Sequence, residues 1–274
     1  MKNPFKLTML LSFTIVIMLT YSFTKNNNAK QPLNKEISPN EYLVMGVLFE
    51  QKAAEFIALS YQAYNIARVM LDNQLKEKPN KNKKCVIVDI DETILDNSPF
   101  EAKCIIEGTS YPKYWKEWVD LGTAKPMPGA VDFLKYALTK GVETFYITNR
   151  NIDNRNITLK NLQAYGFPNV DTLHLLTKND KVGSKEIRRK KIAEKYEIML
   201  LIGDNLADFS AIYDNQTVDK RYAATDSLKN EFGKKFIILP NAMYGDWENA
   251  IYNYNFKLSA QEKDEIRKKS LISF

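Results

Sequence analysis

Hydrophobic positions recur with two different periods along this chain, and the change of period divides it. From about Pro39 to Leu75 apolar residues return every three or four positions, as at Phe56, Leu59 and Ala63, which predicts a helix. A polar, lysine-rich linker, Lys76–Lys84, follows this region. Beyond the linker the apolar residues form short continuous runs instead, which is typical of buried strands.

The part after the linker alternates these apolar runs with amphipathic stretches. The expected strands are Val86–Asp89, Glu143–Thr148, Met199–Gly203 and Phe236–Leu239. The expected helices between them are Ala130–Thr139, Asn154–Tyr165 and Ser184–Tyr196. An alternation of strands and helices predicts an α/β fold with a doubly wound parallel sheet that helices cover on both faces.

The first 30 residues have a different pattern and are expected to lie outside the fold. Lys2 and Lys6 precede an uncharged, mostly apolar run from Leu7 to Thr24, and a polar stretch follows it. A basic start before a short apolar run is typical of an export signal or of an uncleaved membrane anchor. No small-x-small cleavage site follows the run, so the sequence leaves cleavage open.

Composition narrows the chemistry. With 45% hydrophobic and 26% charged residues among 274, the chain has a globular composition, which excludes collagen, coiled coils and disorder. Its net charge of +6 suits an anionic substrate or surface without specifying nucleic acid. One histidine, His174, excludes zinc sites built from several imidazoles, and two cysteines, Cys85 and Cys104, exclude a four-cysteine zinc site. Catalysis would therefore depend on carboxylates, lysine and a hard metal ion.

Polar residues follow three of the expected strands at the point where each ends. Asp89 and Asp91 end the first strand, Thr148 ends the second, and Asp204 ends the third, with Asp208 four residues later. Open parallel sheets bind ligands beyond the carboxyl ends of their strands, so we expect these side chains to converge. Each has an ordinary alternative, because D-x-D pairs are common at strand ends and acidic residues often cap helices. Their order at successive strand ends favours the joint interpretation.

Converging carboxylates repel one another unless a cation neutralises them. Ligation by oxygen alone, completed by water and substrate phosphate, suits Mg²⁺. Lys185, in the helix that precedes the third strand, and the hydroxyl of Thr148 supply donors for phosphate oxygens. A lysine in a charged helix is otherwise usually solvated. The set as a whole predicts phosphoryl transfer through an aspartyl-phosphate.

The chain resembles the haloacid dehalogenase (HAD) superfamily of phosphohydrolases at four motifs, DIDET, ITNR, SKEIRR and GDNLADF. More closely, it resembles the bacterial class C acid phosphatases, the lipoprotein-type acid phosphatase and 5′-nucleotidase family with four motif aspartates. Further similar segments are YWKEWVD, PMPGAVDFL and PNAMYGDWE. The resemblance implies a HAD-like, Rossmannoid sheet with a small, mainly helical cap built from the N-terminal helices and an insert.

The resemblance also implies a role for each matching aspartate. Asp89 resembles the nucleophile that attacks phosphorus. Asp91 resembles the general acid and base, and gives the metal its backbone carbonyl. Asp204 resembles the Mg²⁺ ligand of the last motif, and Asp208 its partner that holds metal-bound water. The implied metal set is therefore Asp89, Asp91, Asp204 and Asp208.

Four further positions match residues that contact substrate in this family. Thr148 and Lys185 resemble the pair that positions the phosphate. Trp115 and Tyr244 resemble the two aromatic residues that sandwich the base or ring of the leaving group. Core packing is the alternative for the aromatic pair, because 12% of the chain is aromatic.

The function implied is a Mg²⁺-dependent acid phosphatase and 5′-nucleotidase acting on nucleoside monophosphates and similar aromatic monoesters. Two alternatives stay open, a related phosphohydrolase for another small phosphomonoester and a non-catalytic surface protein that binds haem or a host ligand. The expected partner is a small phosphomonoester and no nucleic acid polymer. A homodimer and membrane association through the N-terminus are left open.

The expected location is the cell envelope, either anchored or secreted. Family members are typically lipidated on a cysteine that ends the signal, and this chain has no cysteine before Cys85, which argues against a lipid anchor. The expected divisions are residues 1–30 as signal or anchor and residues 31–274 as the phosphatase domain, with a helical part at about 39–75 and a catalytic core at about 84–255.

Overall fold

A computed structural model describes residues 38–77, 82–178 and 184–274. The expected signal or anchor, residues 1–30, lies outside the described residues. None of the helices in the described ranges has the length and hydropathy needed to cross a membrane.

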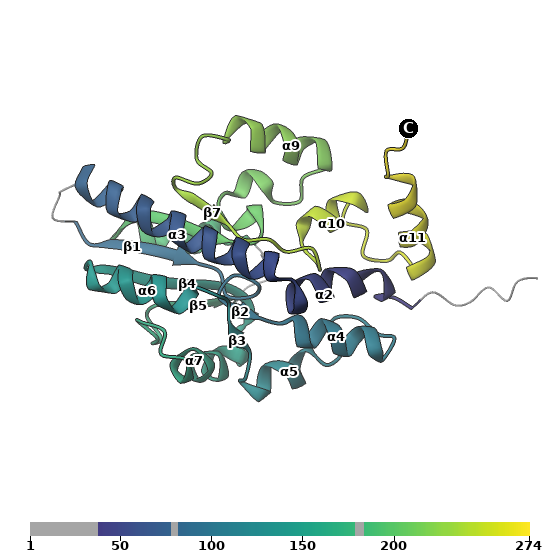
Figure 1. Ribbon diagram of the computed structural model, residues 1–274, viewed down its shortest axis with the longest axis horizontal. Coiled ribbons are helices and arrows are strands. Elements are labelled where there is room, and N and C mark those ends of the chain that lie inside the picture. Colours follow the sequence, from purple (N-terminus) through teal and green to yellow (C-terminus); the bar gives the residue numbers. More distant parts are fainter. Residues whose placement is uncertain (1–37, 78–81, 179–183) are drawn as a thin grey trace, which may run out of the picture. The chain divides into compact units, whose positions relative to one another are not determined.

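The centre of the fold is a sheet of five strands (Figure 1). The strands are β1 (Lys84–Val88), β4 (Val142–Asn151), β5 (Leu175–Lys178), β6 (Glu197–Gly203) and β7 (Phe236–Ile238). They lie in the order β5-β4-β1-β6-β7, and every neighbouring pair is parallel. The prediction of a parallel α/β sheet is therefore confirmed, and the order places the carboxyl end of β1 between those of β4 and β6.

Helices and short turns connect the strands. The α-helices are α2 (Val44–Lys52), α3 (Ala54–Glu77), α4 (Ser98–Ile106), α5 (Trp115–Leu121), α6 (Ala130–Thr139), α7 (Arg155–Ala164), α8 (Glu186–Ala193), α9 (Val218–Ser227), α10 (Asp246–Ile251) and α11 (Ala260–Lys269). The 3₁₀ turns are η1 (Glu41–Leu43), η2 (Ile152–Asn154), η3 (Leu206–Asp208) and η4 (Ala211–Tyr213), and a small antiparallel ribbon pairs β2 (Leu95–Asp96) with β3 (Lys125–Pro126). The helix α6 has the predicted bounds.

Alternate side chains of β1 enter two separate cores. Val86 and Val88 are buried among residues of α3 and α6, whereas Cys85 and Ile87 are buried among residues of β4, β6 and α8. Successive side chains of a strand point to opposite faces, so the burial of both sets means that both faces of the sheet are covered. Cys85 is a buried free thiol, as is Cys104 on α4, so the two cysteines are not bonded to each other.

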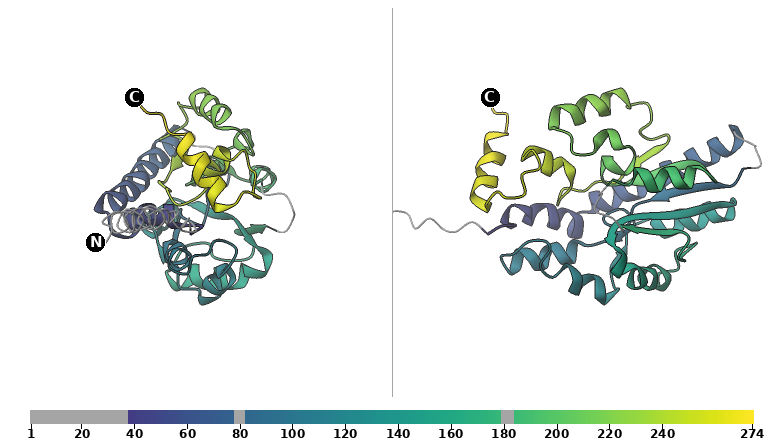
Figure 2. Two further views of the ribbon diagram at one scale, coloured as in Figure 1. Left: turned by 90° about the vertical axis from the view of Figure 1, so that its right-hand side faces the viewer. Right: turned by 180° about the vertical axis from the view of Figure 1, so that it is seen from behind.

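The N-terminal helix expected from about Pro39 to Leu75 is divided into α2 and α3. Ala53 separates them with an extended backbone, φ −82° and ψ 125°. On either side of this break the two helices pack differently, because α3 lies along α6 and the sheet while α2 packs against α4. Figure 2 shows α2, α4 and α5 at the end of the sheet where β1 terminates, as expected for a helical cap from the N-terminal helices and an insert.

The fifth strand, β5, was not expected from the sequence. It has only four residues, and His174 immediately precedes it. The imidazole Nε2 of His174 lies 2.9 Å from Glu143 Oε2, and its Nδ1 lies 2.9 Å from Asp171 Oδ1. The single histidine therefore joins the start of this edge strand to β4, away from the predicted catalytic residues.

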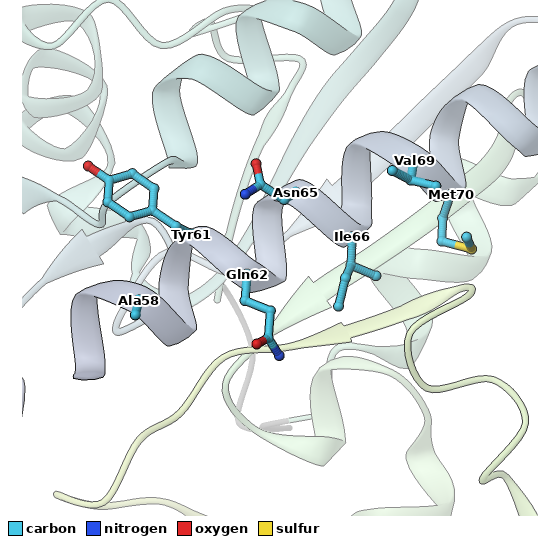
Figure 3. A pocket seen from close by; sticks show the side chains of 7 residues that line it. All are labelled: Ala58, Tyr61, Gln62, Asn65, Ile66, Val69 and Met70. Carbon is cyan, nitrogen blue, oxygen red and sulfur yellow. The ribbon is translucent and has the colours of Figure 1, made fainter. Parts of the chain in front are cut away.

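The exposed side of α3 carries a shallow depression of about 580 Å³. Figure 3 shows its lining residues, which come from α3 alone: Ala58, Tyr61, Gln62, Asn65, Ile66, Val69 and Met70. None of them is one of the predicted site residues. The candidate site is therefore located by its side-chain chemistry and not by this depression.

Candidate active site

The adjacent ends of β1 and β6 bring three aspartates together. Asp89 directly follows β1, Asp204 follows β6, and the backbone N–H of Asp89 donates to the carbonyl of Ile202 at 3.0 Å. Asp208 ends η3. One carboxylate oxygen from each aspartate lies within 4.8 Å of the others. The structure thus groups three of the four aspartates expected at the metal.

Glycine at position 203 allows this grouping. A Cβ atom at Gly203 would lie 2.3 Å from Asp208 Oδ2, which no relaxed structure tolerates. That Oδ2 accepts a hydrogen bond from the backbone N–H of Asn205 at 3.1 Å, and Asn205 in turn caps η3. The G-D-N-x-x-D spacing therefore folds the Asp208 carboxylate back against the end of β6.

Lys185 lies at the N-terminus of α8 and joins two of these aspartates. Its Nζ contacts Asp89 Oδ1 and lies 2.6 Å from Asp208 Oδ1, and the side chain is 8% exposed. Burial alone would lower the pKa of Lys185, but the carboxylates of Asp208 and Asp89 raise it above its ordinary value. The ammonium group therefore stays charged and offsets part of the acidic charge.

The remaining charge favours a cation. Burial raises the pKa of Asp89 well above its ordinary value, Lys185 opposes this, and Asp208 and Asp204 add to it. Burial together with Asp208 raises the pKa of Asp204 to about 7. Three carboxylates against one ammonium leave an excess of negative charge that a divalent ion would neutralise. All the donors are oxygen atoms, so this set fits a hard cation.

Asp91 is held apart from this group by a buried arginine. Its Oδ1 accepts hydrogen bonds from Arg150 Nη2 at 2.8 Å and Nε at 3.0 Å, and from Asn97 Nδ2 at 2.8 Å. The side chain of Arg150 is 2% exposed and that of Asp91 is 17% exposed. Two carboxylates that are two residues apart thus have different cationic partners, an ammonium for Asp89 and a guanidinium for Asp91.

Thr148, near the end of β4, is fully buried beside Asp91. Its hydroxyl donates to Asp91 Oδ2 at 3.3 Å and accepts from the backbone N–H of Arg150 at 3.1 Å. The pairing of β4 with β5 shifts register between Ile147 and Asn151, so the strand is irregular where these residues occur. The role expected for Thr148 with the phosphate stays a prediction.

Sequence reasoning missed several polar partners of the predicted residues. Thr93 Oγ1 donates to Asp204 Oδ1 at 3.1 Å, and Asn241 Nδ2 donates to Asp204 Oδ2 at 2.9 Å. Arg150 is the last residue of the ITNR motif and Asn241 lies in PNAMYGDWE, so both were within segments that signalled the family. Asn97 had no such signal, because its contacts depend on the tertiary fold.

The two predicted aromatic residues lie on separate elements. Trp115 begins α5 and packs edge-on against Phe100, with ring centroids 5.0 Å apart and an interplanar angle of 77°. Tyr244 lies in the loop after β7 and packs against a small cluster that includes Met243. Among the described residues no ring contact joins Trp115 to Tyr244. Their expected role around a leaving group stays a prediction.

Known acid phosphatases match this chain in sequence and in overall structure. The family model described as "HAD superfamily, subfamily IIIB (Acid phosphatase)" matches residues 15–247. The structure of the class C acid phosphatase from Bacillus anthracis superposes with a TM-score of 0.84 at 42% identity, over 87% of this chain and 100% of that chain. A second crystal structure of that phosphatase, with tungstate bound, matches with the same values.

Plant proteins are more distant relatives. The stem 31 kDa glycoprotein of Glycine max is 28% identical over 131 residues, or 44% of this chain and 50% of the relative. Acid phosphatase 1 of Solanum lycopersicum is 26% identical over 132 residues, again 44% of this chain and 50% of the relative. The chain thus spans about half the length of these relatives. The match to the family model over most of its length shows that the chain belongs to HAD subfamily IIIB, the acid phosphatases, a family of phosphoric monoester hydrolases.

Proposed function

We propose that this chain hydrolyses nucleoside monophosphates and similar aromatic monoesters with Mg²⁺, through an aspartyl-phosphate on Asp89. The observation that carries the proposal is the pair of carboxylates in different surroundings at the end of β1. Asp89, Asp204 and Asp208 form an acidic group. Asp89 contacts the Lys185 ammonium within the acidic group, whereas Asp91 is bound by Arg150 outside it. Two carboxylates with separated environments suit the two roles of nucleophile and proton carrier.

In the first step an oxygen of Asp89 attacks phosphorus in line, and the bond from phosphorus to the leaving oxygen breaks. Asp91, in its protonated form, donates its proton to that oxygen. In the second step Asp91 takes a proton from water as the water oxygen attacks phosphorus and releases Asp89.

Lys185 and the acidic group have complementary tasks in this proposal. The ammonium opposes the rise in the pKa of Asp89 that burial causes, and it is available to phosphate oxygens. Asp89, Asp204 and Asp208 would hold the cation, with the backbone carbonyl of Asp91. A bound Mg²⁺ supplies positive charge that offsets the charge of the incoming phosphate. Tungstate, which is bound in a crystal structure of the Bacillus anthracis relative, is a tetrahedral oxyanion like phosphate. Its binding there supports a phosphate site in this family.

Phosphate release from a panel of monoesters tests the proposal. We expect release from nucleoside 5′-monophosphates that stops with EDTA and returns with Mg²⁺. Release from sugar phosphates alone would assign a different substrate to the same site. No release from any monoester in the presence of Mg²⁺ would favour a non-catalytic binding protein.

We also propose that residues 1–30 direct the chain out of the cytoplasm to the cell envelope. The support is the basic start and the uncharged run from Leu7 to Thr24. Fractionation of cells that express the full chain, with a variant lacking residues 1–24 as the control, measures this. Full-length protein recovered from the cytosol would contradict the proposal.

A further inference from the structure

Two tryptophans of α5 connect to Asp91 by separate routes. The indole Nε1 of Trp118 donates to Asn97 Oδ1 at 2.8 Å, and Asn97 Nδ2 donates to Asp91 Oδ1 at 2.8 Å. The guanidinium carbon of Arg150, which also binds Asp91, lies 5.6 Å from the centre of the Trp115 ring. The helix that carries the expected leaving-group aromatic thus also carries a contact to the expected acid and base.

The amide of Asn97 has one allowed orientation. Its Oδ1 accepts from both Trp118 Nε1 and Arg150 Nη2, the latter at 3.3 Å, while its Nδ2 faces the Asp91 carboxylate. A flipped amide would place its NH₂ group against two donors and its oxygen against a carboxylate. Asn97 is only 1% exposed, so water does not replace a lost partner. The indole N–H therefore fixes the direction from which Asn97 binds Asp91.

The two oxygens of Asp91 are held unequally. Oδ1 receives three donors, two from Arg150 and one from Asn97, at 2.8–3.0 Å. Among the residues that the structure describes, Oδ2 receives only longer contacts, from Thr148 Oγ1 at 3.3 Å and Arg150 Nε at 3.4 Å. An oxygen whose lone pairs are occupied by strong donors is a poor site for a proton, so Oδ2 is the oxygen suited to exchange one with substrate and water.

We propose that Trp118 is a positioning residue, which holds Asp91 through Asn97 so that Oδ2 faces the leaving oxygen. The inference rests on the proposed function, because it takes Asp91 as the proton donor. The monoesters that depend on this positioning are those whose leaving group is a basic alkoxide that needs a proton, as in a nucleoside 5′-monophosphate.

The leaving group gives a readout that a merely structural role would not change. A 4-nitrophenolate leaves as a stable anion and gains little from a proton donor, whereas a sugar alkoxide depends on one. A misplaced proton donor therefore slows hydrolysis only of the ester whose leaving group is a sugar alkoxide. The quantity to compare is kcat/KM, because it reports the steps up to loss of the leaving group and is unaffected by hydrolysis of the phosphorylated enzyme.

The test variant is Trp118→Phe, which keeps an aromatic ring and removes the N–H donor. We expect kcat/KM for nucleoside 5′-monophosphates to fall about ten-fold, while that for 4-nitrophenyl phosphate changes less than about two-fold, as loss of one hydrogen bond to the donor implies. Asn97→Ala should give the same selectivity. In the double variant kcat/KM for nucleoside 5′-monophosphates should be little lower than in Asn97→Ala alone, because both changes interrupt the same chain of hydrogen bonds to Asp91.

A matched control removes a hydrogen bond elsewhere. Tyr136 on α6 donates to Asp72 on α3 at 2.6 Å, and Tyr136→Phe should leave the ratio of the two kcat/KM values unchanged. Equal losses for both esters in Trp118→Phe, or additive losses in the double variant, would overturn the inference. A wild-type enzyme that hydrolyses neither ester would instead overturn the proposed function, before any variant is compared.

Discussion

Replacing Lys185 with methionine leaves the carboxylates of Asp89 and Asp208 without the one cationic partner that they share among the described residues, while the length of the side chain is kept. Lys185 is 8% exposed and contacts both Asp89 and Asp208. Removing one partner from a buried ion pair typically costs about 3–5 kcal/mol. For a domain of this size each kcal/mol changes Tm by about 2–4 °C, so the metal-free variant should unfold about 6–20 °C below the wild type.

Two conditions should restore stability to the Lys185→Met variant. Saturating Mg²⁺ should reduce the difference in Tm, because the cation neutralises the same carboxylates. Lower pH should also reduce the difference in Tm. The pKa of Asp89 is higher in the folded state than in the unfolded chain. As the pH falls, Asp89 is therefore protonated in the folded state before it is protonated in the unfolded chain, and the folded state gains stability.

Calorimetry of metal-free protein measures these differences in Tm. Lys103→Met is the matched control, because it removes a lysine whose ion pair with Glu107 is about half exposed, and we expect almost no change in Tm. A Lys185→Met variant as stable as this control, without metal and at neutral pH, would contradict this prediction. The ammonium would then not lie between the carboxylates in solution.

Asp89→Asn should lower kcat for phosphate release by about 10³-fold or more, because an amide oxygen is a poor nucleophile; near-normal turnover would contradict the assignment. The affinity for Mg²⁺, measured by titration calorimetry, should fall as the pH is lowered through about 7, because a proton on Asp204 then competes with the cation. An affinity independent of pH would refute this. Trp115→Ala and Tyr244→Ala should each lower kcat/KM for nucleoside monophosphates about ten-fold. For small aliphatic monoesters kcat/KM should fall much less. Equal decreases for both classes of substrate would show that the two rings have only a structural role.

The sequence predicted the strands that are buried on both faces. Interior parallel strands such as β1 and β6 consist of continuous apolar residues, which is a strong local signal. The short edge strand β5 has alternating burial over four residues and was missed, because so short a pattern does not separate a strand from a loop. The break at Ala53 was missed as well, since nothing in the local sequence marks it and the packing of α2 on α4 decides it.

The acidic group was predictable because topology places it. Once the strands are parallel, the residues that follow β1 and β6 meet at one edge, and the structure brings Asp89, Asp204 and Asp208 together there. The contacts of Asp91 with Arg150 and Asn97 were not predictable in the same way. They depend on side chains of distant segments that reach one carboxylate, and no periodicity records such convergence.

Trapping the phosphorylated enzyme tests most directly whether phosphorus passes through Asp89. The measurement is a rapid acid quench during turnover of a substrate labelled in its phosphate group, followed by peptide mapping of the protein. We expect an acid-stable label that hydroxylamine removes, located on the peptide that contains Asp89 and absent from Asp89→Asn. Release of labelled phosphate with no adduct at any quench time, or an undiminished adduct in Asp89→Asn, would contradict it.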